Sequence, residues 1–558
     1  MHERLGRPAA ILARYFHSLR YLKPCQVGGR LYHRVYRPRL SRQAAPEKRR
    51  PVNSLVNGRV RAQTMHGADS FRFLNEPGRV SRPEDWNDFG RDKLWLYNLH
   101  YFDDLNAVGA KQRRDWHTGL IRRWIEENPP TQGNGWEPYP VSLRVVNWIK
   151  WDLHYSALDR RAVESLALQL RWLRRRLEHH LLGNHLLANA KALVFGGLYF
   201  QGQESDEWLR TGMSLLNREL AEQILPDGGH FELSPMYHLI VLEDLLDVIN
   251  VRRTYDRPIP VEWLVKAQQM LRWAAVMRHP DGNIPFFNDA ALDIAGGFEA
   301  LRAYAKRLDI STPPEETGGG IWLKSSGYLR LSNDEAALFF DVAAVGPDYL
   351  PGHAHADTLS IELSLFCQRV LVNSGTSVYG TGPERQRQRG TDSHNTIVVD
   401  DQDSSEVWGG FRVARRARIR NAVYVPADGV AVAEHDGYSR LPGRPIHQRR
   451  VELSKGVLTV VDIVSGARRH RVQGTWHLHP DVDIEYMGCE PDAGLLLRVP
   501  VGNEVREAML TVQGPVALAV QECTWHPEFG RAVPSRRLVF RYDGPLPVTV
   551  TTRLHWRR

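Results

Sequence analysis

Cysteine is scarce in this chain, and its few copies are scattered. The 558 residues contain four cysteines, and no two of them form a CxxC pair; they are Cys25, Cys367, Cys489 and Cys523. A disulfide framework or a zinc cluster of the finger type needs several cysteines at close, regular spacing. The sequence therefore predicts isolated thiols.

Long apolar runs are also missing. The N-terminal segment MHERLGRPAAILARYFHSLRYLK is basic, and Arg14 and His17 interrupt its apolar residues. It lacks the apolar core of a secretory signal, and no stretch of the chain approaches the length of a membrane span. We expect no membrane span and a cytoplasmic location, with a periplasmic or exported location as the alternative.

Acidic residues are fewer than basic ones, 64 against 73, which gives a formal net charge of +9. The excess is mainly arginine and is spread over the whole chain, so an anionic partner is expected. Nucleic acid stays open on charge alone, although zinc-finger and RNP-like spacings are lacking. An anionic polysaccharide fits equally well, because guanidinium groups bind carboxylates and sulfates in bidentate fashion. The oligomeric state is not indicated.

Length and patterning predict three regions. A chain of this length exceeds a single hydrophobic core. Residues 1–60 form a basic arm with one helix near 8–22, in which 37–51 is a linker or a wrapped segment. Residues 61–317 are helical and residues 318–558 are β-structure, because the apolar period changes from three or four to two near Gly318–Gly320. The expected helices are 142–157, 162–182, 185–201, 206–224, 235–253 and 260–278.

The segment GHAHADTLSIEL (352–363) carries the most informative pair of side chains. His353 and His355 lie two residues apart and lead into an alternating strand pattern, so both imidazoles point the same way on an extended backbone. Imidazole suits proton transfer or metal binding near neutral pH. His394 could join His355 as a metal ligand, with Asn373 or Asp357 as an oxygen donor.

Two predicted helix starts in the helical region bear polar side chains. Asn184 is expected as the N-cap of a helix that follows Gly183, with His185 in its first turn. Ser234 is expected as the N-cap of the next such helix, and Pro235 as its first residue. Helix starts present free N–H groups and the positive end of the helix dipole, which favour an anion.

The second helix start places Tyr237 and His238 in its first turn, with His230 and Glu232 in the preceding loop. A tyrosine held near cations ionises more easily and can serve as an acid or base.

In the strand region, three arginines alternate with other residues and would share one face of an extended segment, either as solvated charge or as carboxylate ligands; they are Arg385, Arg387 and Arg389.

Taken together, these segments resemble the heparinase II/III-like polysaccharide lyases, which include alginate and heparan-type lyases. The resemblance is carried in order along most of the chain by LWLYNLHYFDDL (94–105), GWEPYPVSLRVVNWIK (135–150), GNHLLANAKAL (183–193), DGGHFELSPMYHLIVLEDLLDV (227–248), PFFNDA (285–290), GHAHADTLSIEL (352–363) and HNTIVVD (394–400). It implies an α+β multidomain fold, in which an incomplete (α/α) toroid is followed by an antiparallel β-sandwich.

The resemblance also implies β-elimination at a uronic acid, which leaves a C4=C5 unsaturated uronate, and an anionic polysaccharide or oligosaccharide partner rather than nucleic acid. Asn184 would contact the uronate carboxylate, with His185 beside it. Tyr237 would be the acid and, for one C5 epimer, also the base; His353 would be the alternative base or neutralise the carboxylate. Seven further residues are candidate substrate contacts: Tyr101, Trp136, Arg144, Glu232, His238, Arg389 and Trp408.

Some relatives hold one structural zinc ion in the β domain, and the matching positions here are His355, Asn373 and His394. Asn373 stands where an aspartate is expected, and a neutral amide is a poorer zinc ligand than a carboxylate. The zinc ion is therefore an open question at this point.

Two other functions compete with the lyase. A glycoside hydrolase on a helical toroid would need two carboxylates across its substrate, for which Glu137, Glu232 and Asp289 are the candidates. A non-catalytic protein that binds exopolysaccharide or takes part in its assembly would agree with the missing export signal. The close grouping of Asn, His and Tyr favours elimination.

Overall fold

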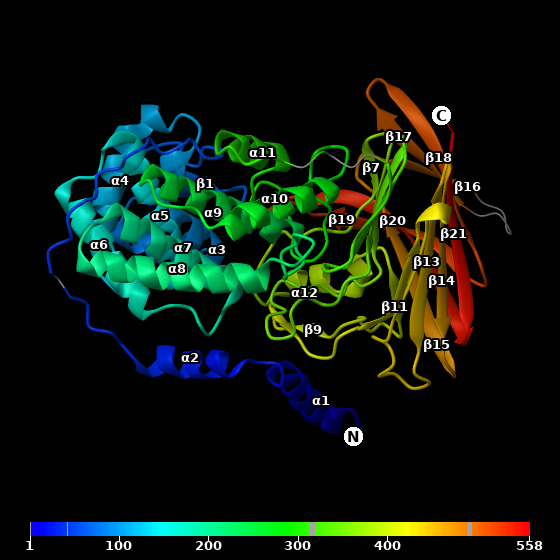
Figure 1. The fold of residues 1–558 in the computed structure, drawn as a ribbon. Helices are drawn as coiled ribbons and strands as arrows, with labels where there is room; N and C mark the ends of the chain where they lie inside the picture. Colours follow the sequence, from blue (N-terminus) through cyan, green and yellow to red (C-terminus); the bar gives the residue numbers. More distant parts are fainter. Residues whose placement is uncertain (1, 42, 313, 315–317, 488–493, 558) are drawn as a thin grey trace.

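The chain folds into a helical domain followed by a β-domain, which lie side by side (Figure 1). This computed structural model describes residues 2–41, 43–312, 314, 318–487 and 494–557, with side chains from residue 11 onward. The predicted fold class is confirmed: an incomplete (α/α) toroid precedes an antiparallel β-sandwich. The strands of the β-domain begin at Gly319, next to the predicted boundary.

The helical domain consists of antiparallel helices joined by short turns, and each of the six expected helices is present. Its helices are α3 (Lys93–Tyr101), α4 (Arg114–Glu127), α5 (Pro138–Tyr155), α6 (Arg160–Arg175), α7 (Gly183–Tyr199), α8 (Gln203–Gln223), α9 (Pro235–Thr254), α10 (Val261–Val276) and α11 (Phe298–Arg307). A small hairpin, β1 (Ser70–Phe73) with β2 (Glu76–Arg79), precedes them.

Helix α7 lies at the centre of this domain. It packs against α5, α8 and α9, and its residues are buried all round except for His185. A helix that is apolar on every side is typical of a core position. The sequence of α7 therefore fixes it in the interior and leaves its N-terminal turn, with His185, at an accessible edge.

The β-domain contains three larger antiparallel sheets. One has the order β3 (Gly319–Leu323), β4 (Tyr328–Ser332), β5 (Ala336–Asp341), β6 (Ile361–Leu365) and β7 (Gln368–Leu371). The second has the order β11 (Ile419–Val425), β12 (Val430–His435), β13 (Ile446–Ser454), β14 (Val457–Ser465), β21 (Val548–Trp556), β18 (Glu504–Gln513), β17 (Gly494–Val501) and β16 (Asp483–Met487). The third has the order β19 (Ala517–Trp525), β20 (Val533–Pro545), β15 (Arg469–His477) and β8 (Ile397–Val399).

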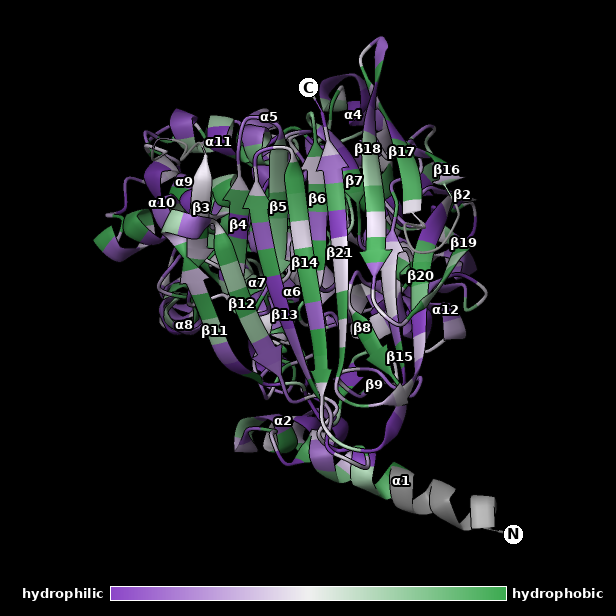
Figure 2. Ribbon diagram, turned by 90° about the vertical axis from the view of Figure 1, so that its right-hand side faces the viewer, coloured by the Kyte–Doolittle hydropathy of each residue, from purple (hydrophilic) through white to green (hydrophobic). Residues whose placement is uncertain are grey.

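These sheets pack face to face around one apolar core. Alternating residues of β13 and β14, such as Val451 opposite Val460, point inward, while the intervening residues are more exposed. Figure 2 looks onto the eight-stranded sheet, where apolar and polar residues alternate along the strands. The alternation of apolar and polar residues in the sequence therefore indicates which face of each strand packs against the core. The short pair β9 (Val407–Trp408) and β10 (Arg412–Val413) lies outside these sheets.

The N-terminal arm contains one helix more than expected. The predicted helix corresponds to α1 (His2–Leu19), and a second helix, α2 (Pro24–Val35), follows in the stretch predicted to be irregular. Gly28 and Gly29 lower the intrinsic helix propensity of α2 and hid it from the sequence pattern. The segment beyond it wraps around the helical domain, where Lys48 forms an ion pair with Asp152 at 2.8 Å.

Cys25, Cys367 and Cys523 are free thiols, as predicted, and Cys489 lies outside the described residues. Among the described residues, the helices are too short or too polar to cross a membrane.

Candidate active site

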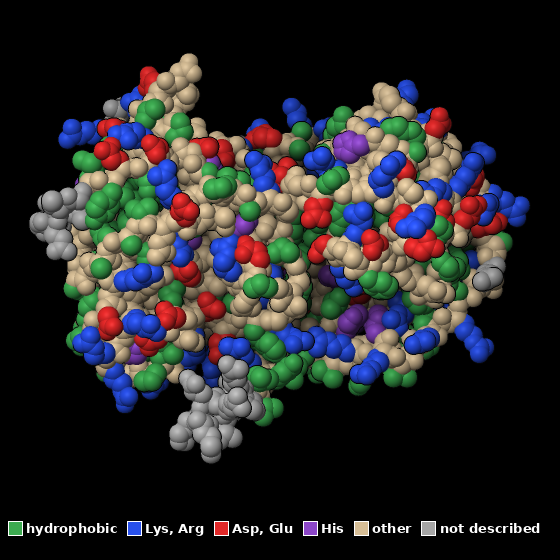
Figure 3. Space-filling view, turned by 180° about the vertical axis from the view of Figure 1, so that it is seen from behind, with side chains coloured by type: hydrophobic (Ala, Val, Ile, Leu, Met, Phe, Trp, Pro, Cys, Tyr) green, Lys and Arg blue, Asp and Glu red, His purple; other side chains and the backbone are tan. Residues whose placement is uncertain are grey.

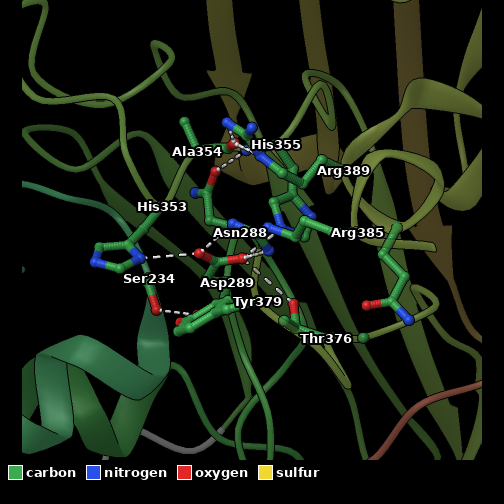
Figure 4. Close-up of polar contacts among 12 residues, drawn as sticks. Ser234, Asn288, Asp289, His353, Ala354, His355, Thr376, Tyr379, Arg385 and Arg389 are labelled. Carbon is green, nitrogen blue, oxygen red and sulfur yellow. Dashed lines mark hydrogen bonds and ion pairs between the residues drawn. The ribbon is translucent and has the colours of Figure 1, made fainter. Parts of the chain in front are cut away.

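One buried carboxylate, Asp289, organises the junction between the two domains (Figure 4). Its Oδ2 accepts a hydrogen bond from His353 Nδ1 at 2.9 Å, and its Oδ1 accepts one from His355 Nε2 at 2.8 Å. Arg385 donates to both oxygens, with Nη2 at 2.8 Å from Oδ2. Burial favours the neutral acid, but the Arg385 charge and the two histidine bonds hold the pKa of Asp289 well below its usual value. Asp289 is therefore an anion.

The local sequence explains why Asp289 lies there. Phe286 and Phe287 are both buried, and they pack into two different apolar clusters. Asn288 adopts a left-handed conformation, with φ of 56°, and its Nδ2 donates to the Leu233 carbonyl at 3.0 Å. This turn fixes Asp289 between the loop before α9 and the loop that contains His353.

His353 and Tyr237 form the centre of the site. Their rings stack with centroids 3.8 Å apart, and the Tyr237 hydroxyl lies 3.1 Å from the Tyr379 hydroxyl. Ser234 caps α9 and accepts a hydrogen bond from Tyr237 N at 3.2 Å, as predicted for this helix start. Burial, together with Tyr379 and Asp289, raises the pKa of Tyr237 well above its usual value. Tyr237 therefore carries its proton in the resting protein.

Glu232 links this pair to the start of α7. Its Oε2 lies 3.7 Å from His353 Nε2, its carboxylate lies close to the Asn184 backbone, and its Oε1 has no hydrogen-bond partner among the described residues. Burial raises the pKa of Glu232, although His353 and Asn184 oppose the shift. Gly183 has φ of 54°, and a Cβ atom there would lie 2.4 Å from Leu350 and 2.9 Å from Glu232 Oε1. Only glycine allows this approach.

The first turn of α7 brings an amide and a second imidazole to the same place. The Asn184 side chain lies close to the Tyr139 hydroxyl, and the Tyr139 ring centroid lies 4.5 Å from that of His185. His185 Nδ1 is 3.1 Å from Glu178 Oε1. Burial disfavours the imidazolium form, but Glu178 outweighs it and raises the pKa of His185 above its usual value.

The four predicted catalytic residues thus lie in one neighbourhood. Tyr237 stacks on His353, and His353 Nε2 lies 3.7 Å from Glu232, which is close to the Asn184 backbone. The Tyr139 ring lies near that of His185, and its hydroxyl is close to the Asn184 side chain. One detail of the prediction was wrong: α7 begins at Gly183, with Leu182 as its N-cap, so Asn184 is already a helical residue. Its side chain is therefore available to a ligand instead of capping the helix.

Several predicted substrate contacts are instead structural. Trp136 is buried in the core, where its indole N–H donates to the Asn128 carbonyl at 3.2 Å. Arg144 is fully buried and donates to the His100 and Gly135 carbonyls at 3.1 and 2.8 Å, which holds two turns of the backbone together. These predictions were wrong, because neither side chain reaches the surface.

His238 and Arg389 are fully buried as well. His238 Nε2 is 3.0 Å from the Met270 carbonyl, and Arg389 donates to the Ala354 carbonyl at 2.9 Å, so neither contacts a substrate. The arginines were expected on an extended segment, but Pro383–Arg389 forms helix α12, which Pro383 starts at its first position. This helix points Arg385 at Asp289.

The remaining two candidates lie at the margin of the site. Tyr101 is 7% exposed, and its ring meets Tyr139 edge-on with centroids 6.0 Å apart, so it supports the site rather than lining it. Trp408 is half-buried beneath α1 and donates its indole N–H to Ser18 at 3.1 Å. The tertiary position of α1 therefore covers the face of Trp408 that was expected to bind substrate.

The predicted metal ligands form an incomplete set. His355 Nδ1 and His394 Nε2 lie 3.3 Å apart, but Asn373 Oδ1 accepts hydrogen bonds from Ser360 Oγ at 2.7 Å and from Asn395 N at 3.3 Å. Within the described residues, no group of three His, Cys, Asp or Glu is placed to hold a metal. Two imidazoles and an amide engaged elsewhere do not fit zinc, which favours four strong donors.

The pattern of residue types did not single out Tyr139 or Tyr379 as members of the site, whereas Arg385 was one of three arginines predicted as possible carboxylate ligands and does bind Asp289. Tyr139 follows the Trp136–Glu137 pair in GWEPYP, and Tyr379 follows the NSG turn, so their proximity to the histidines could only have been found from the fold. For Asp289 the residue types indicate only a hydrolase carboxylate. Its bond to Arg385 spans 96 positions in the sequence.

A helical toroid joined to an antiparallel sandwich, with Tyr, His and Asn at their junction, defines a class of two-domain proteins. Residues 106–307 match the family model described as Heparinase II/III N-terminus, and residues 315–557 match the model described as Heparinase II/III-like, C-terminal. The chain belongs to the heparinase II/III-like family.

Proteins similar to this chain include heparin-sulfate lyases. A heparin-sulfate lyase of Bacteroides stercoris is 27% identical over 40% of this chain and 36% of its own length, and one of Pedobacter heparinus is 26% identical over 57% and 55%. The chain therefore spans less than two thirds of the length of these relatives. A crystal structure of heparinase III has a TM-score of 0.66 at 16% identity, covering 87% of this chain and 79% of that one. This last likeness concerns the fold.

The pairing of His185 with Glu178 leads to a prediction about pH. In Glu178→Gln the carboxylate that raises the pKa of His185 is lost while burial, which lowers it, remains. The imidazolium form will then disappear at lower pH than in the parent protein. If substrate binding uses this charge, KM will begin to rise at lower pH in the variant, and KM measured across pH 5–9 checks the shift. An unchanged profile would contradict a role for the charge.

Proposed function

We propose that this protein is a polysaccharide lyase that cleaves a uronate-containing anionic polysaccharide by β-elimination. The observation that carries the proposal is the arrangement of Tyr237 and His353. The protonated Tyr237 stacks on His353, whose Nδ1–H is held by the ionised Asp289. A histidine bound in this way presents its unprotonated Nε2 to a substrate, which is the form needed for a general base.

The first requirement of the reaction is to neutralise the uronate carboxylate, since the C5 proton is not acidic beside an ionised carboxylate. The Asn184 amide and the His185 imidazolium lie together at the start of α7, where the helix dipole also favours an anion. Glu232, whose pKa is raised, can donate a hydrogen bond in its protonated form. These groups would stabilise the enolate-like intermediate as an oxyanion site does.

The proton transfers follow from the two stacked rings. His353 Nε2 removes the C5 proton, and the electrons of that C–H bond pass through the carboxylate-stabilised intermediate to form the C4=C5 double bond. The C4–O bond breaks, and Tyr237 gives its hydroxyl proton to the departing glycosidic oxygen. Tyr379 is positioned to return a proton to Tyr237 through the 3.1 Å contact between their hydroxyls.

The carboxylates do not favour the hydrolase alternative. Asp289 is fully buried, ionised and bound by Arg385 and two histidines, so it can neither donate a proton nor activate a water. Glu137 forms an ion pair with Lys93 at 3.0 Å and accepts the Tyr97 hydroxyl. Glu232 alone does not make the pair that hydrolysis needs.

The substrate class rests on the relatives and on surface charge. The similar proteins are named heparin-sulfate lyases. On the face shown in Figure 3, Lys, Arg and His side chains gather around a hollow in the half occupied by the helical domain, which suits a polyanion. The test is incubation with a panel of uronate polymers, followed by ultraviolet absorbance of the C4=C5 double bond. New reducing ends without absorbance would indicate hydrolysis, and binding without cleavage would support a non-catalytic role.

Zinc is not part of the proposed mechanism, which yields a separate prediction. We expect purified protein to contain well under one equivalent of zinc, and a chelator to leave both turnover and the unfolding temperature unchanged, because Asn373 is engaged by Ser360 and Asn395. Elemental analysis and thermal unfolding with and without chelator are the measurements. Stoichiometric zinc, lost together with stability, would contradict this prediction.

A further inference from the structure

The N-terminal arm carries an exposed apolar stripe. On α1 the exposed side chains include Leu12 (69% exposed), Phe16 (62%) and Leu19 (53%), spaced i, i+4, i+7. On α2 they include Leu31 (61%) and Val35 (80%), which continue from Val27 at i, i+4, i+8. This spacing places each set on one side of its helix.

The opposite, more polar sides of the two helices hold the arm to the body of the protein. On α2, Gln26 is buried and donates to the Tyr349 carbonyl at 3.1 Å, and His33 lies 3.0 Å from the Leu177 carbonyl. On α1, Ser18 accepts the indole N–H of Trp408. An amphipathic helix of a globular protein normally turns its apolar side inward, and here that side faces away.

The two helices form a continuous ledge at one side of the molecule. Figures 1 and 2, which are related by a 90° rotation, both show α1 and α2 in a row beneath the two domains. Figure 3 shows apolar side chains gathered along the same lower margin. At 1.5 Å per residue, helices of 18 and 12 residues are about 27 and 18 Å long. The ledge is therefore long enough to lie along an extended surface.

The charge of the arm indicates which kind of surface it would bind. From Arg4 to Pro46 the sequence contains no acidic residue and ten basic ones, namely Arg4, Arg7, Arg14, Arg20, Lys23, Arg30, Arg34, Arg37, Arg39 and Arg42. Arg14 on α1 and Arg30 and Arg34 on α2 are exposed, as is Arg20, which directly follows α1. Such an arm would repel a second copy of itself, whereas it is attracted to anionic headgroups.

We propose that this arm is a membrane-surface anchor, which lies flat on a bilayer rich in anionic phospholipid. The apolar stripe enters the boundary between headgroups and acyl chains, and the arginines pair with lipid phosphates. A helix with an apolar face and a basic polar side binds a membrane in this orientation without crossing it. The arm would then lie between the membrane and the two domains, and the polysaccharide site would be held close to the membrane.

Vesicle flotation tests the anchor with the full-length protein. Vesicles of phosphatidylcholine and phosphatidylglycerol in equal parts should carry the protein upward at low salt, while vesicles of phosphatidylcholine alone should carry much less. Replacing Leu12, Phe16 and Leu31 together with glutamate should weaken binding about tenfold or more, because the substitution removes the inserted side chains and adds repulsion. Replacing Arg14, Arg20 and Arg30 with glutamine should weaken binding and remove most of its salt dependence.

The matched control replaces exposed valines elsewhere, Val108, Val261 and Val265, with glutamate. This control has the same change in net charge and should bind like the parent protein. Equal loss of vesicle binding in the control and the stripe variant would contradict the proposed anchor, because the change in net charge alone would then explain the loss. Lack of flotation of the parent protein with anionic vesicles at low salt would also overturn it. So would an arm-dependent dimer in sedimentation experiments without vesicles, since a second copy would then occupy the stripe.

Discussion

Tyr237→Phe will lower turnover of the uronate polymer by about 10²–10⁴-fold, which is the range that a single general acid contributes. The substitution removes only the hydroxyl, and the ring that stacks on His353 at 3.8 Å stays in place. KM will change little, because the groups proposed to bind the carboxylate belong to α7 and Glu232. The initial rate of ultraviolet absorbance and KM are the quantities to measure.

Tyr379→Phe is the matched control for this experiment. It removes the other hydroxyl of the 3.1 Å pair and leaves the proposed acid intact. The turnover of Tyr379→Phe should fall far less than that of Tyr237→Phe. The substitution should slow only the step in which Tyr237 regains its proton. Equal losses in the two variants would contradict the assignment of Tyr237 as the acid. A Tyr237→Phe protein with unchanged turnover would refute the proposed mechanism.

Asp289→Asn will damage both activity and stability. The amide can no longer accept hydrogen bonds from His353, His355 and Arg385 as an ion does, and the fully buried Arg385 loses its counter-charge. Removing one partner of a buried ion pair leaves the other charge buried and unpaired, which lowers the unfolding free energy by about 3–5 kcal/mol. Turnover will fall about 10²–10⁴-fold, because His353 is no longer held with Nε2 unprotonated.

A double replacement separates these two effects. Asp289→Asn with Arg385→Met removes the ion pair altogether, so most of the lost stability should return. Activity should not return, because His353 still lacks its anionic partner. Denaturant unfolding and turnover are measured on all three variants and the parent. Recovery of turnover together with stability would show that Asp289 supports only the fold, and His353 would then need another orienting group.

The sequence predicted residues well where a local signal and a motif coincide. Ser234 was recognised as the N-cap of α9, and this placed Tyr237 in its first turn. His353 and His355 were predicted to share a direction on an extended segment; the structure has turns and irregular backbone there, and both nevertheless bind Asp289, on different oxygens. For Tyr237 the position in the first helical turn already determines the direction of the side chain, whereas for the two histidines the shared partner depends on the loop conformation.

Predictions from the sequence were wrong where the same residue type is typical of both a substrate site and a core. Trp136 and Arg144 lie in a motif rich in aromatic and basic residues, which is typical of a carbohydrate site and equally typical of a core. Arg144 is buried against the Trp124 ring, with its guanidinium carbon 3.8 Å from the ring centroid, and it donates to two backbone carbonyls and to the Gln169 side chain. Residue type does not distinguish the two cases, because exposure is a property of the packed domain.

By itself, the sequence determined the order of the two domains, most of the helices, and the segments that carry the amide, the tyrosine and the histidines. These properties follow from periodicity, capping and spacing, which act between near neighbours in the chain. Only the tertiary structure decided that Asp289 and Arg385, 96 positions apart, form the ion pair that orients His353, and that the apolar side of the arm faces outward. Both depend on which surfaces meet when the domains pack, and no local pattern encodes that contact.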